Sequence, residues 1–111
     1  MATRALASSE WQAYFDRLSR ALRSAPARIE VAGLDLGDQY EAEWAALEGL
    51  SYDPKDRVFS VFLPGLEHNI REPKQVFVDE GPDGLHSVEI VDADGRRHLV
   101  RLEQLLRLPA A

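Results

Sequence analysis

Three histidines are the residues of this sequence best suited to acid–base chemistry. They are His68, His86 and His98, and imidazole is the side chain whose charge changes near neutral pH. Nucleophilic catalysis would also need a serine or threonine activated by one of them and oriented by an acid. The sequence contains no G-x-S-x-G motif to mark such a nucleophile. We therefore assign no catalytic residue, and keep a hydrolase that uses His68 with nearby carboxylates as an alternative.

The densest polar segment of the chain runs from His68 to Pro73, between two strand-like runs. In a compact domain the carboxylate-rich segments 35–38 and 53–56 could approach it. The simpler interpretation is structural, because Asn and His side chains bond a bent backbone and Pro73 fixes a turn or the start of a strand. We keep His68, Asn69 and Arg71 as candidate binding residues.

Charge is distributed unevenly along the chain, whose net charge is −6. Residues 1–28 contain five arginines and two acidic residues, whereas residues 29–56 contain one lysine and eight acidic residues. We define the acidic arm as the four candidate binding residues Asp35, Asp38, Glu41 and Glu43. A solvated face is its simpler interpretation, and a contact surface for a cation or a basic protein partner is the functional one.

The sequence contains no complete metal-binding or cofactor-binding motif among those we considered. The chain has no cysteine, which excludes disulfides and cysteine-ligated metals. Asp92, Asp94 and Gly95 resemble part of a calcium loop, but Arg97 stands where that loop needs glycine. A hairpin turn explains these residues better, and no phosphate-binding glycine motif occurs. We expect no metal and no cofactor.

The clearest element is an amphipathic helix over residues 10–24. Trp11, Phe15, Leu18 and Leu22 recur at the spacing that places them on one face. Ser9 and Gln12 have the spacing of a capping box. We expect the apolar face to pack on a β core.

Short β-patterned runs joined by turn residues follow this helix through residues 27–108. Residues 39–52 are ambiguous between strand and helix, and we favour a strand with a bulge or bend near residues 45–49. With 45% hydrophobic residues in 111, the chain can bury one modest core. We predict one α+β domain over residues 1–111, with the helix on a bent antiparallel sheet or small β-barrel of about six strands.

Four short motifs, taken in order, resemble a family of small bacterial proteins known only as a domain of unknown function. The resemblance covers residues 11–108 and supplies no catalytic residue to carry over. It implies a bacterial source. The motifs are Leu36-Gly37-Asp38-Gln39, Gly49-Leu50-Ser51-Tyr52-Asp53, His68-Asn69-Ile70-Arg71-Glu72-Pro73 and Asp92-Ala93-Asp94-Gly95.

We expect a cytoplasmic, non-catalytic binding or interaction module. A small-barrel nucleic-acid binder is a further alternative, with Arg17, Arg20, Arg23 and Arg28 as its basic strip. The acidic net charge argues against nucleic acid, since phosphate binding depends on clustered Lys and Arg. No apolar run reaches the length of a membrane helix, so we expect no membrane partner.

We predict a homodimer, because the basic first quarter of the chain complements the acidic second quarter and a small β domain has strand edges to cover. Sedimentation at micromolar protein should show a species of twice the 12.5 kDa chain mass. A single 12.5 kDa species would contradict this prediction.

Overall fold

The computed structural model describes residues 2–22, 28–33 and 39–107, and these form one α-helix and nine strands. A 3-10 turn, Ser8–Glu10, leads into the helix α1, Trp11–Leu22. The strands are β1 (Ala2–Leu6), β2 (Arg28–Gly33), β3 (Gln39–Ala46), β4 (Gly49–Asp53), β5 (Val58–Leu63), β6 (Leu66–Arg71), β7 (Pro73–Gly81), β8 (Gly84–Asp92) and β9 (Arg97–Leu106).

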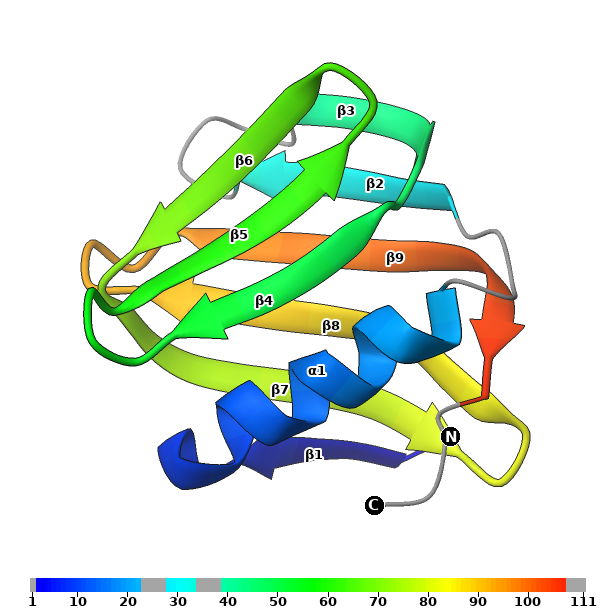
Figure 1. Ribbon diagram of the computed structural model, residues 1–111, viewed down its shortest axis with the longest axis horizontal. Helices are drawn as coiled ribbons and strands as arrows, with labels where there is room; N and C mark the ends of the chain where they lie inside the picture. Colours follow the sequence, from blue (N-terminus) through cyan, green and yellow to red (C-terminus); the bar gives the residue numbers. More distant parts are fainter. Residues whose placement is uncertain (1, 23–27, 34–38, 108–111) are drawn as a thin grey trace.

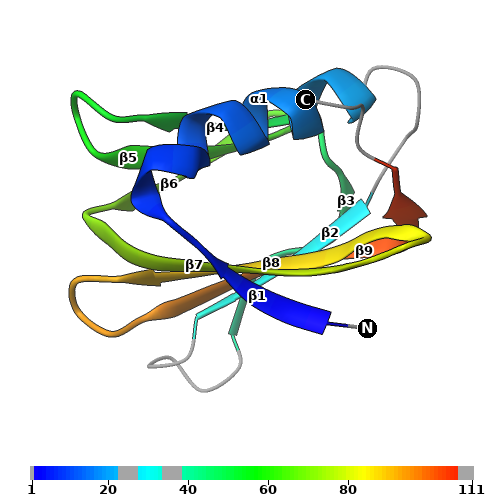
Figure 2. The same cartoon turned by 90° about the horizontal axis from the view of Figure 1, so that it is seen from below.

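The strands form two antiparallel sheets that face each other across the core. The larger sheet has the order β1-β7-β8-β9-β2-β3, and the smaller has the order β4-β5-β6. Helix α1 lies beside β4 and completes the layer of the smaller sheet (Figures 1 and 2). The apolar faces of the two layers meet, so the core lies between them.

Helix α1 carries the apolar stripe that its sequence predicts. Trp11, Phe15, Leu18 and Leu22 are all buried, and Phe15 has no exposed surface. The Phe15 ring meets the Phe59 ring of β5 edge to face, with 4.9 Å between centroids. This contact joins the helix to the inner face of the smaller sheet.

The start of the helix differs from the predicted cap. The 3-10 turn begins at Ser8, one residue before Ser9, with Ala7 at the cap position. The Ala7 amide donates to the Glu10 carboxylate at 3.2 Å, and the Glu10 amide donates to the Ala7 carbonyl at 2.8 Å. Glu10 therefore takes the role predicted for Gln12, so the predicted Ser9 cap is wrong.

A serine of α1 bonds to the backbone of β4 at its edge. The Ser19 hydroxyl donates to the Leu50 carbonyl at 2.8 Å and accepts from the Leu50 amide at 3.1 Å. A hydroxyl can do both at once. The hydroxyl thus satisfies both backbone groups that Leu50 presents at an edge strand.

The predicted α+β class, helix and antiparallel strands are confirmed. The strand over residues 39–46 is confirmed as β3, and the predicted bend follows it where Leu47 and Glu48 carry the chain to the other sheet. The barrel alternative is wrong, because the described strands form two separate sheets. The count of about six strands is low: β1 and β6 were missed, and β4 was merged with the segment before it.

Over residues 2–22, 28–33 and 39–107, no helix is long and apolar enough to cross a membrane.

We predict that Phe15→Ala lowers the free energy of unfolding by about 3–5 kcal/mol, the cost of truncating a buried aromatic side chain. Chemical denaturation measures this loss. Gln12→Ala is the matched control, because Gln12 is an exposed residue of the same helix, and it should change stability by less than about 0.5 kcal/mol. A loss below about 1 kcal/mol for Phe15→Ala would contradict the packing described above.

Candidate functional site

Two histidines and an aspartate form a hydrogen-bonded chain between the two sheets. The Nε2 of His68, on β6, lies 3.1 Å from the Nδ1 of His98, on β9. The Nε2 of His98 lies 2.9 Å from the Oδ2 of Asp92, at the end of β8. The side chains of His98 and Asp92 are only 12% and 10% exposed. We call these three residues the His–His–Asp chain.

Asp92 is positioned by the turn that joins β8 to β9. Its Oδ1 accepts from the backbone amides of Asp94, at 2.9 Å, and Arg96, at 3.0 Å. Gly95 has a φ of 82°, a left-handed conformation that favours glycine. The hairpin predicted from these residues is confirmed, and it holds the second carboxylate oxygen towards His98.

The environment of Asp92 keeps its carboxyl group ionised. Burial by itself raises its pKa, but the hydrogen bonds from His98, Arg96 and Asp94 outweigh burial and hold the pKa below its ordinary value. An ionised carboxylate only accepts hydrogen bonds. His98 Nε2 therefore carries a proton, and neutral His98 presents Nδ1 as an acceptor to His68 Nε2–H.

Chemically, this linear arrangement can hold and move protons. Its three groups do not converge on one point, because Asp92 and His68 occupy opposite nitrogens of the His98 ring. A metal ion needs several ligand atoms directed at one centre. Accordingly, the part of the chain that the structure describes contains no group of three His, Cys, Asp or Glu residues able to hold a metal.

A shallow hollow of about 440 Å³ lies on the outer face of the smaller sheet. Ser60 and Asn69 are paired across β5 and β6, and the Ser60 hydroxyl donates to Asn69 Oδ1 at 2.8 Å. Acidic residues line more of the hollow than basic ones. Its lining residues are Asp53, Asp56, Val58, Ser60, Glu67, Asn69 and Arg71.

The structure separates the candidate residues of the segment 68–71. Strand geometry alternates side chains between faces, so His68 and buried Ile70 point inward, whereas Asn69 and Arg71 line the outer hollow. Of the two carboxylate-rich segments expected near this one, residues 53–56 contribute Asp53 and Asp56 to the hollow. The carboxylate that the His68 side chain reaches, through His98, is Asp92.

The acidic arm is described only in part. Glu41 and Glu43 lie on β3, at the edge of the larger sheet. Asp35 and Asp38 lie outside the described residues. Whether the arm contacts a partner stays a prediction.

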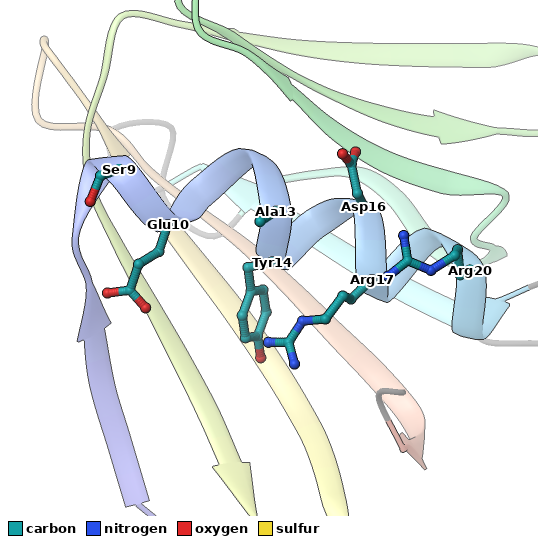
Figure 3. A pocket seen from close by; sticks show the side chains of 7 residues that line it. All are labelled: Ser9, Glu10, Ala13, Tyr14, Asp16, Arg17 and Arg20. Carbon is teal, nitrogen blue, oxygen red and sulfur yellow. The ribbon is translucent and has the colours of Figure 1, made fainter. Parts of the chain in front are cut away.

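A second hollow, of about 490 Å³, lies along the exposed side of α1 (Figure 3). The guanidinium of Arg17 stacks over the Tyr14 ring, 5.2 Å from its centroid. The Tyr14 hydroxyl donates to Glu80 Oε1 at 2.8 Å, and burial together with Glu80 raises the Tyr14 pKa. Tyr14 therefore ties the helix to β7.

The hollow along α1 includes part of the basic strip that the nucleic-acid alternative would use. Arg17 and Arg20 line it together with Glu10 and Asp16, so the hollow contains as many acidic residues as arginines. Arg23 lies outside the described residues, and of Arg28 only the backbone position at the start of β2 is described. This arrangement adds nothing in favour of phosphate binding.

Sequence reasoning missed the roles of His98 and Asp92. A signal was present in the alternation of β9, because His98 stands two residues before buried Val100 and so shares its inward face. The same alternation marks His68 through Ile70. Two inward histidines on β-patterned runs indicate a contact inside the core, but the pairing itself depends on how the sheets pack.

Comparison with known proteins agrees with the resemblance seen in the sequence. A family described as "Family of unknown function (DUF5335)" matches residues 2–111. An "Uncharacterized protein" from Aquifex aeolicus (strain VF5) is 40% identical over 110 residues, covering 98% of this chain and 99% of that protein. No solved structure matches. The predicted membership of a family of unknown function is confirmed.

We predict that Asp92→Asn destabilises the protein at neutral pH by about 1–3 kcal/mol, the cost of disturbing buried hydrogen bonds. Because the folded pKa of Asp92 is below its ordinary value of 3.8, its charge stabilises the fold above that pH and the gain is lost as pH falls through the folded pKa. The stability difference between the wild-type protein and Asp92→Asn should therefore shrink in acid.

Urea unfolding across the acid range measures this difference. Asp94→Asn is the matched control, because the Asp94 side chain is exposed in the same turn, and its stability should follow the wild-type pH profile. A constant difference between the wild-type protein and Asp92→Asn down to the most acid pH would contradict the prediction.

Proposed function

We propose that this chain, which belongs to the DUF5335 family, is a non-catalytic interaction module that binds a basic, extended segment of a partner protein along β6. The observation that carries the proposal is the hollow on the outer face of the smaller sheet, beside the side of β6 that pairs with no described strand. The expectation of a bacterial, cytoplasmic protein is part of the same proposal.

The edge of β6 provides the backbone groups for such binding. Among the described strands, β6 pairs only with β5, so its other side presents amides and carbonyls without a strand partner. The opposite edge of the same sheet, β4, is covered by Ser19 of α1. An extended peptide adds to a free edge through main-chain hydrogen bonds, while pockets for its side chains supply specificity.

The charge of the hollow identifies the chemistry of the partner. Glu67 projects from β6 itself, Asp53 is the last residue of β4, and Asp56 lies in the turn between β4 and β5. Arg71 is the one cation among the described lining residues. Lysine or arginine side chains of an added strand would lie beside Glu67 in the negative potential to which Asp53 and Asp56 add, whereas acidic side chains would meet an unfavourable potential.

The hydrolase alternative gains an oriented imidazole from the His–His–Asp chain, but Ser60, the serine of the neighbouring strand β5, faces the opposite side of the sheet. Val61 is the residue paired with His68, and the neighbouring Ser60 donates to Asn69 on the outer face. The imidazoles lie on the inner face, because successive strand residues alternate. We therefore favour binding over catalysis.

We predict that a peptide as long as β6, with alternating Lys and Thr, shifts backbone amide NMR signals of β6 and of the hollow. A peptide with alternating Glu and Thr should bind more weakly. Methylating alternate peptide amides should also weaken binding, because it removes main-chain donors. Asp56→Asn combined with Glu67→Gln should raise the Kd about fivefold, as expected for two exposed charge pairs, and reduce its salt dependence.

Asp53 is left unchanged, since its Oδ1 accepts from the amides of Lys55 and Asp56 and stabilises the turn. Glu48→Gln is the matched control, as Glu48 is exposed and outside the hollow. Glu41→Gln with Glu43→Gln tests the acidic arm separately. Three results would contradict the proposal. They are loss of binding only in the variant with Glu41→Gln and Glu43→Gln, equal binding of the two peptides, and a homodimer in which the second copy occupies the edge of β6 and excludes the peptide.

A further inference from the structure

We propose that the His–His–Asp chain is a proton-operated link that holds β6 against the larger sheet and opens when both histidines are protonated. His68 belongs to the smaller sheet, whereas His98 and Asp92 belong to the larger one. The contact between the two imidazoles therefore joins the sheets directly. This inference does not depend on the proposed peptide binding.

Counting protons explains why the link has two states. With both rings neutral, His98 donates through Nε2 to Asp92 and accepts at Nδ1 from His68 Nε2–H. One added proton is compatible with the same contact, because a single hydrogen still lies between the two facing nitrogens. A second added proton places an N–H on each of them, so two cationic donors oppose each other and no acceptor remains.

Asp92 contributes to this behaviour by charge as well as by hydrogen bonding. Its carboxylate attracts positive charge on the His98 ring. The burial of His98 and Asp92 limits screening by solvent, so two charged rings in contact repel each other strongly. The closed link is therefore stable with zero or one added proton and is destabilised by the second.

The residues that pair with His68 and His98 in the two sheets carry no charge. The residues paired with His68 and His98 are Val61 of β5, Ile90 of β8 and Gly33 of β2. The charged residue next to His68 is Glu67, and the one next to His98 is Arg97, which forms an ion pair with Glu89. Glu67 and Arg97 both lie on the outer faces of their strands. Arg96 is exposed in the turn and reaches Asp92 through its backbone amide.

Opening would act on β6 before other strands. β6 is the edge strand of the smaller sheet; β5 is the described strand with which it pairs, and Ile70 anchors it in the core. Strands β7 and β8 lie inside the larger sheet, each with two neighbours. Loss of the link should therefore loosen β6 while β7 and β8 keep their hydrogen bonds.

Hydrogen exchange of the intact protein, followed by NMR from about pH 8 to about pH 5, tests the link over the range in which histidine takes up protons. We expect the protection factors of β6 amides to fall about tenfold, with those of β7 and β8 nearly unchanged. Imidazole ¹⁵N signals recorded on the same samples report the protonation of each ring. The fall should follow the second proton taken up by the pair.

His68→Gln is the informative variant, because a glutamine amide can donate to His98 Nδ1 but takes up no proton. Its β6 protection should change less than about twofold over the same pH range. His86→Gln is the matched control, because His86 is not part of the His–His–Asp chain. This variant should behave as wild type. If His68→Gln does not fold, the wild-type titration still decides.

Two results would overturn the proposal. One is proton uptake by both rings in the wild-type protein without loss of β6 protection. The other is an equal loss of protection in the wild-type protein and in folded His68→Gln.

Discussion

The two sheets have unequal widths, and the architecture depends on how this difference is filled. The six-stranded sheet presents an apolar face that three strands cannot cover, so α1 lies beside β4 and completes the second layer. This constraint explains why the helix stripe is rich in large side chains. The Phe15 ring packs against the Phe59 ring, and the Trp11 and Tyr52 ring centroids lie 5.1 Å apart. Aromatic rings therefore fill the junction between helix and sheet.

Each edge strand of the smaller sheet is held by a different polar side-chain contact. At β4, the Ser19 hydroxyl satisfies both backbone groups of Leu50 and leaves that edge closed. At β6, the His68 side chain contacts His98 of the larger sheet, and β5 is the described strand that pairs with the β6 backbone. One edge of the smaller sheet is thus bonded to the helix, and the other is attached through a histidine side chain. Both of our functional proposals concern this second edge.

The spacing of residues close together in the sequence predicted the parts of the fold that depend on interactions between such residues. The stripe from Trp11 to Leu22 marked the helix, and the turn residues Asp92 to Gly95 marked a hairpin. Strand β6 was missed because its outward residues, Asn69 among them, are polar enough to resemble a loop. The contact of His68 with His98 joins residues 30 apart in the chain through the packing of two sheets. No local pattern encodes that distance, so the candidate residues were found without their partners.

Strand β1 has a consequence for the order in which the chain folds. It pairs with β7, placing Leu6 opposite Val76, whereas β7, β8 and β9 are joined by tight hairpins. Closing a loop of about 70 residues costs more chain entropy than closing a hairpin, and distant pairings slow folding. We therefore expect the hairpins to form before β1 pairs with β7. Until β1 is in place, the β7 edge of the larger sheet lacks its strand partner, which makes that edge the one open to association with another chain.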